Sequence, residues 1–164
     1  MTARSRRTAG TLRSRPCRRA LGLAAIASLG LTACDAPREL QPDQALRDSL
    51  GLTVRDRVHQ VDLIARNGVE TAVPALVTVR PGDHVSFRSA DGFLHLVRFV
   101  ADSLDGEGRA WLDAMRVESP PLLDRGARWV VGFERAPSGR YSYTLEGNLR
   151  PGRGVVVVDA QSRF

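Results

Sequence analysis

Apolar residues recur at every second position over most of the chain from Val58 onward, the spacing of a half-buried β-strand. Turn signals separate these stretches: Asn67-Gly68 is a strong two-residue hairpin signal, and Pro81-Gly82 separates two further strands. About seven short strands joined by such turns predict an antiparallel β-sandwich. The inward positions of these strands predict one core, formed by Val85, Phe87, Val97, Phe99, Trp129, Val131, Tyr141 and Tyr143.

Two segments depart from this alternation. In residues 104–116, Trp111 and Met115 are spaced as on one face of a helix, so we expect a short helix there. Residues 34–55 begin with prolines and mixed charges and predict a tether, within which a short helix would end at Gly51.

The first 33 residues have the features of an export signal. Seven arginines and no acidic residue are followed by an apolar run over residues 20–33, which is too short for a permanent membrane span. The run ends in "LTAC", which resembles the bacterial lipobox, with Leu31 at its start and Cys34 at its end. In that family the cysteine receives a diacylglycerol and becomes the first residue of the mature protein. The resemblance implies a lipoprotein signal peptide at residues 1–33 and a lipid anchor at Cys34.

This anchor would hold the mature protein on the periplasmic side of a bacterial membrane. An ordinary cleaved signal with a chance cysteine is the alternative. Asp35 directly after the cysteine resembles an inner-membrane retention signal of some Gram-negative bacteria, but that rule varies, so the inner and the outer membrane both stay open. Beyond the tether, residues 56–164 form the predicted domain, and the mature chain is long enough for one core.

The charge and the cysteines of the mature chain exclude several functions. Seven of the 24 arginines precede Cys34, which leaves 17 arginines against 18 acidic residues. A nearly neutral domain has no basic patch for a phosphate backbone, so we expect no nucleic-acid partner. Cys17 leaves with the signal and Cys34 is lipidated, so the domain has no thiol for a disulfide, a nucleophile or a metal.

The order of motifs over residues 58–159 resembles the small blue-copper proteins of the plastocyanin type, the cupredoxins. The stretch "VTVRPGDHVSFRSADGFLHLVRF" is similar to that family's strand, Pro-Gly turn, strand and first copper-ligand histidine, here His95. The stretch "SGRYSYTLEGNLRPGRGVVVV" is similar to its closing hairpin, in which a tyrosine-rich strand leads into the ligand loop. The resemblance implies an all-β fold, an antiparallel Greek-key β-sandwich with one short helix.

The remaining ligands of a blue-copper site have no counterpart in this sequence. Such a site needs two histidines and one cysteine, usually with a weak axial methionine. The resemblance places the cysteine at Leu145, the second histidine at Asn148 and the methionine near Arg153. An arginine there would repel a cation, because its guanidinium stays charged. His95 is the retained ligand position, and we expect no type 1 copper and no other cofactor.

The other histidines offer no replacement ligands. His84 precedes Val85, the first inward position of its strand, so we expect it to point to solvent. His59 lies in the first strand, and nothing in the sequence brings it to the closing loop. We therefore interpret His95 as a core or rim histidine whose ring nitrogens bond Asn148, a backbone carbonyl or water; a metal ligand is the alternative.

These residues leave three classes of function to compare. A copper-free, non-catalytic binding or structural module on a lipid anchor, with an unknown envelope protein as partner, agrees best with the missing ligands. The alternative is a copper-binding or electron-transfer cupredoxin with a non-standard site that uses His95. We expect no enzyme, because a serine and a histidine somewhere in a chain do not make a catalytic geometry.

Overall fold

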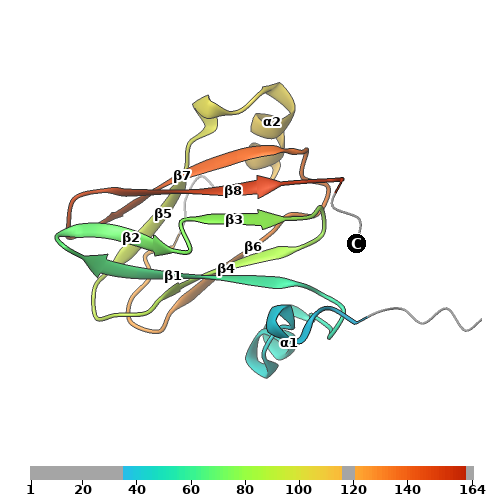
Figure 1. Cartoon of the computed structure of the whole chain (residues 1–164), viewed down its shortest axis with the longest axis horizontal. Helices are drawn as coiled ribbons and strands as arrows, with labels where there is room; N and C mark the ends of the chain where they lie inside the picture. The colour runs from blue at the N-terminus through green and yellow to red at the C-terminus, as the bar shows by residue number, and fades with distance from the viewer. Residues whose placement is uncertain (1–34, 116–120, 162–164) are drawn as a thin grey trace, which may run out of the picture. The chain divides into compact units, whose positions relative to one another are not determined.

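The computed structural model describes residues 35–115 and 121–161, so the predicted signal peptide and Cys34 lie outside the described residues. Two four-stranded sheets pack face to face as a β-sandwich with few helices (Figure 1), which confirms the predicted all-β sandwich. The elements are η1 (Arg38–Leu40), α1 (Gln44–Leu50), β1 (Val58–Arg66), β2 (Val69–Val73), β3 (Leu76–Val79), β4 (His84–Ser89), β5 (His95–Phe99), η2 (Ala101–Ser103), α2 (Gly106–Ala114), β6 (Arg128–Gly132), β7 (Gly139–Gly147) and β8 (Gly152–Val158).

The two sheets are mixed rather than purely antiparallel. The first has the strand order β2-β1-β4-β6 and the second β3-β8-β7-β5. Among the strand pairings of the described residues, four are antiparallel, while β1–β4 and β3–β8 are parallel. The antiparallel expectation fails at these two pairings because the chain passes from one sheet to the other between β2 and β3 and returns before β4. Neighbours that are not joined by a hairpin are free to run in the same direction.

Both predicted turns have the expected backbone geometry. Asn67 and Gly68 have φ angles of 52° and 75°, and they place Arg66 opposite Val69 in a two-residue hairpin. At the second turn Gly82 has φ 97°, a conformation that favours glycine. These turns fix which side chains of the neighbouring strands face inward.

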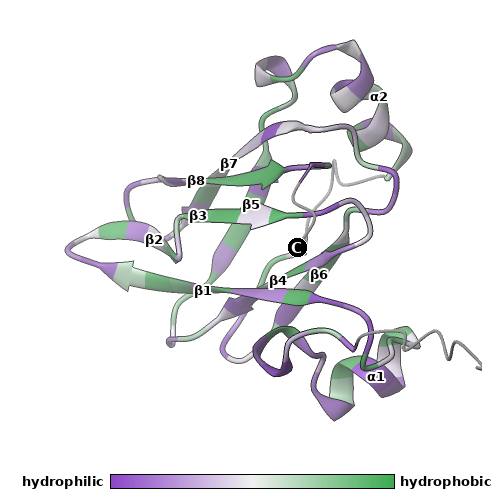
Figure 2. Ribbon diagram, turned by 45° about the vertical axis from the view of Figure 1, so that its right-hand side comes forward, coloured by the Kyte–Doolittle hydropathy of each residue, from purple (hydrophilic) through white to green (hydrophobic). Residues whose placement is uncertain are grey.

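The predicted core is present between the sheets. Figure 2 shows hydrophobic and hydrophilic residues alternating along several strands, as expected for strands with one buried face. Seven of the eight predicted core residues are buried, and Trp129 is partly buried against them. The ring of Phe87 lies at the centre of an aromatic cluster, with centroids 6.2 Å from Phe99, 5.8 Å from Trp129 and 5.2 Å from Tyr143.

The two predicted helices are also present. In α2 the side chain of Asp105 caps the first turn by accepting from the Gly108 N–H at 2.8 Å, and Trp111 stacks on Phe133. Helix α1 ends at Gly51 in the left-handed conformation, as expected from the sequence. Neither helix, nor any other in the described residues, is long and apolar enough to span a membrane.

The segment predicted to be a tether is folded onto the domain over the residues that the structure describes. Ala36 in its first part and Leu46 in α1 are 6% and 8% exposed. The Ala36 N–H donates to the carbonyl of Val54 at 3.2 Å, and the carboxylate of Asp43 is paired with Arg128 at the start of β6. Burial of these two apolar side chains and these polar bonds therefore hold the segment in place, although its composition resembles a linker.

Candidate functional site

His95 lies at the start of β5, and its side chain is completely buried. The strand pairs with β7, where Gly147 is the residue opposite His95. On its other side the backbone of His95 exchanges two hydrogen bonds with Leu123, at 2.9 and 2.8 Å. The backbone of this residue is thus held from both sides, and burial of the side chain restricts the ring.

Two carboxylates occupy the two ring nitrogens of His95. Nδ1 lies 2.6 Å from Oε2 of Glu70, and Nε2 lies 2.9 Å from Oδ1 of Asp91. An ionised carboxylate only accepts hydrogen bonds, so with both acids ionised the ring donates from both nitrogens and is positively charged. We call Glu70, Asp91 and His95 the carboxylate–histidine network.

Glu70 belongs to β2, and the register fixed by the Asn67-Gly68 turn points its side chain inward toward His95. It is 1% exposed, and its Oε1 accepts from the backbone N–H of Leu149 in the loop between β7 and β8 at 3.2 Å. Gly147 and Gly152 lie so close to Glu70 that a Cβ at either position would collide with it. The network therefore joins β2 and β5 to the β7–β8 loop.

Asp91 reaches the network from the loop between β4 and β5. Burial raises the pKa of its carboxyl, but hydrogen bonds from the backbone N–H groups of Ala65 and Phe93 and from the His95 ring outweigh this effect. The net result is a pKa of Asp91 below its ordinary value. The ionised form of Asp91 is thus favoured by the folded structure.

The lowered pKa of Asp91 predicts how the network responds to acid. A carboxylate whose pKa is lower in the folded than in the unfolded chain adds stability above its unfolded pKa, and this contribution is lost as the pH falls through the folded pKa. We therefore expect Asp91→Asn to lower the free energy of unfolding at pH 7 and to have a smaller effect below about pH 4. Urea unfolding at both pH values measures this. Asp102→Asn, at an exposed position in η2, is the control, and an equal Asp91→Asn effect at both pH values would contradict the prediction.

The structure corrects the predicted partners of His95. It is a core histidine, as interpreted from the sequence, but Asn148 is exposed and is not among the partners of its ring. The sequence interpretation missed Glu70 and Asp91. A signal was present for Glu70: after the Asn67-Gly68 turn, the alternation places it on the same inward face as Ala72, and a buried acid needs a partner.

The residues at the expected ligand positions do not fit a type 1 copper centre. Leu145 is completely buried and supplies no donor atom, while Arg153 is exposed on β8. A metal-binding imidazole must offer a nitrogen lone pair, but both ring nitrogens of His95 face carboxylates. In the part of the chain that the structure describes, no group of three or more His, Cys, Asp and Glu side chains is placed to hold a metal ion.

The other two histidines lie away from the network. His59 bonds Asp83 through Nε2 at 2.9 Å. The prediction that His84 points to solvent is wrong, because its side chain is only 11% exposed and its Nε2 lies 3.2 Å from Oε1 of Glu134. The reason is local: Gly132 lies opposite His84, and the Glu134 carboxylate folds over that glycine and covers the neighbouring ring.

Solved cupredoxin structures are similar to this chain. A reduced amicyanin variant is 23% identical, with a TM-score of 0.43 and a match that covers 62% of this chain and 82% of that chain. The purple cupredoxin from Nitrosopumilus maritimus is 21% identical, with a TM-score of 0.43 and coverage of 62% and 99%. No family model matches the chain, and no curated protein matches it. The description of this chain as a β-sandwich rests on the two sheets in its own structure and not on this similarity.

Proposed function

We propose that this protein is a lipid-anchored module of the bacterial cell envelope that has a cupredoxin-like fold without type 1 copper. It acts by binding or by structural support rather than by catalysis. One observation carries the proposal: two carboxylates occupy both ring nitrogens of the histidine that the sequence resemblance places as a copper ligand. Hydrogen bonds to these carboxylates occupy the two ring nitrogens through which a histidine would bind a metal.

The burial of the network supports a non-catalytic role. A general acid or base must come within hydrogen-bond reach of its substrate, directly or through one water. The side chains of His95 and Glu70 are both 0% exposed, so a substrate cannot contact either of them in this structure. Asp91, with a side chain 24% exposed, has its Oδ1 and Oδ2 engaged by His95 and by backbone N–H groups.

The lipid anchor is supported by the sequence. A basic segment, an apolar run and the lipobox-like "LTAC" occur in the order that lipoprotein export requires. On this proposal Cys34 carries the lipid, the domain faces the periplasm, and its partner is another envelope protein. Separation of the inner from the outer membrane distinguishes the two possible locations.

Copper binding tests the central part of the proposal. Purified protein with added Cu(II) is expected to stay colourless, without the intense charge-transfer band of a copper–thiolate bond, because the described domain has no cysteine and no free imidazole at His95. Absorbance spectroscopy and metal analysis of the protein as isolated measure this. Stoichiometric, tightly held copper that is lost in His95→Ala would overturn the copper-free proposal and favour the electron-transfer alternative.

Fractionation of cells tests the anchor. The wild-type protein is expected in the membrane fraction with a lipid label, and Cys34→Ser is expected to lose the label and become soluble in the periplasm. A diacylglycerol with a further acyl chain holds a protein stably, whereas one acyl chain holds it only marginally, so the difference should be clear. Equal solubility of wild type and Cys34→Ser would contradict lipid attachment.

A further inference from the structure

The chain is fixed to the domain almost immediately after the proposed lipid attachment. Ala36 is buried, its N–H donates to Val54, and its carbonyl accepts from Nε2 of Gln41 at 2.9 Å. Cys34 lies two residues before Ala36, and consecutive Cα atoms are about 3.8 Å apart, so the two Cα atoms are separated by at most about 7.6 Å. A tether of this length gives the domain little freedom relative to its anchor.

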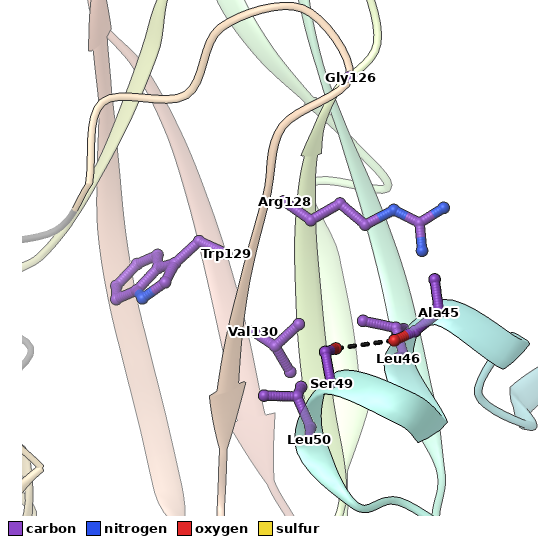
Figure 3. Close-up of a pocket in the computed structure, with 8 residues that line it drawn as sticks. All are labelled: Ala45, Leu46, Ser49, Leu50, Gly126, Arg128, Trp129 and Val130. Atoms are coloured by element: carbon purple, nitrogen blue, oxygen red, sulfur yellow. Dashed lines mark hydrogen bonds between the residues drawn. The ribbon is translucent and has the colours of Figure 1, made fainter.

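The residues that follow form one face of the domain. Helix α1 is attached to β6 by the ion pair between Asp43 and Arg128, and this bond also lowers the pKa of Asp43. Figure 3 shows Ser49 and Leu50 of α1 facing Val130 of β6 across a shallow pocket. We call residues 35–57, which include η1 and α1, the α1 face.

The carboxylate–histidine network lies at the opposite end of the sandwich. Figures 1 and 2 both show α1 beside the beginning of β1, with the β1–β2 turn at the far end of that strand. The β7–β8 loop, which binds Glu70, is at the far end too, because Arg150 in this loop donates its N–H to the carbonyl of Gly68. The nine residues of β1 separate the two ends by about 30 Å, at roughly 3.3 Å per residue.

We propose that the α1 face lies on the surface of the membrane and that the network end of the sandwich faces the aqueous compartment. This inference rests on the lipid attachment at Cys34 in the proposed function. It assigns the contact with phospholipid headgroups to the α1 face, where Leu50 is half-exposed. It also leaves the exposed apolar side chains of Phe93, Leu94 and Leu122, which neighbour the network, accessible to a partner in the periplasm.

The charge of the α1 face indicates that the covalent anchor, and not attraction to anionic lipids, sets this orientation. Residues 35–57 contain four arginines and five acidic residues, and Arg128 adds one more positive charge. Attraction of a protein to an anionic membrane needs an excess of basic residues near the surface. We therefore expect the orientation to be the same at low and at high salt.

Site-specific fluorescence quenching tests the orientation. The Cys34 sulfur is consumed by the lipid and the mature chain has no other cysteine, so one introduced cysteine can be labelled alone. Asp48→Cys on the α1 face and Asn148→Cys in the β7–β8 loop, both at exposed positions, form a matched pair. The lipidated mature chains, labelled with bimane, are reconstituted in phosphatidylcholine vesicles that contain a nitroxide-headgroup lipid. Quenching is expected to be several-fold stronger at position 48 than at position 148, at low and at high salt.

Mass spectrometry of the same samples separates the two proposals. Absence of a diacylglycerol on Cys34 would overturn the proposed anchor, whereas a lipidated protein with equal quenching at both positions would overturn the orientation alone. A flexible Gly-Ser segment inserted between Asp35 and Ala36 keeps the lipobox and the docked residues, and it is expected to reduce quenching at position 48. Unchanged quenching in that variant would show that the short tether does not set the orientation.

Discussion

His95→Leu is expected to lower the free energy of unfolding by about 3–5 kcal/mol, the usual cost of removing one partner from a buried ion pair. The variant leaves Glu70 completely buried without a cation, and its Oε1 keeps only the backbone N–H of Leu149. It also removes the His95 ring that bonds Oδ1 of Asp91. Urea unfolding of the signal-free protein, followed by tryptophan fluorescence, measures the loss.

A double variant separates lost charge pairing from lost packing. Replacing a buried ion pair with apolar residues of similar volume is often nearly neutral. The combination of Glu70→Leu with His95→Leu is therefore expected to be more stable than His95→Leu alone. Glu146→Gln, which breaks the exposed pair between Glu146 and Arg98, is the control and should cost less than about 1 kcal/mol. A His95→Leu effect as small as that of Glu146→Gln would mean that the network does not hold the fold together.

Phe87→Ala is expected to cost about 3–5 kcal/mol, because truncation of a buried aromatic residue removes its contacts and leaves a cavity. The side chain is completely buried, and its ring contacts Phe99 and Tyr143 of the opposite sheet as well as Trp129 of its own sheet. Trp129→Ala should cost less, because this residue is only partly buried. Denaturant unfolding of both variants gives the two values.

Phe93→Ala is the matched control for Phe87→Ala. Phe93 is 44% exposed in the β4–β5 loop, and surface substitutions usually change stability by no more than about 0.5 kcal/mol. A loss below about 1 kcal/mol for Phe87→Ala would place its ring outside the core and contradict the strand register described above.

The strands and turns could be predicted because their signals are local. Asn67-Gly68 has two residues that accept positive φ angles, and this fixes the register of β1 against β2. The parallel pairing of β1 with β4 has no such signal, because it depends on the path of the chain between the two sheets. The folded segment around Ala36 was missed for a related reason: its contacts with Val54 depend on tertiary packing, whereas its prolines and charges are typical of a linker.

The sequence predicted the histidine of the candidate site but not the partners of its ring. The resemblance identified His95 and the absence of ligands at Leu145 and Asn148, but it gave no partner for the ring. Glu70 and His95 are separated by 25 residues and belong to different sheets, so only the packing of the two sheets brings them together. Alternation places each of them inward, but it does not say which inward residues meet.

The close approach of Glu70 to Gly147 and Gly152 limits how the β7–β8 loop can be redesigned. A longer loop that carries a cysteine and a histidine from another protein could be transplanted between these strands to introduce a metal centre. Such a graft must keep glycine at both positions, since a Cβ at Gly152 would overlap the backbone carbonyl of Glu70 and a Cβ at Gly147 would overlap its carboxylate. A saturation library at these two positions should therefore return glycine almost exclusively, whereas Asn148, between them and exposed, should accept most residues.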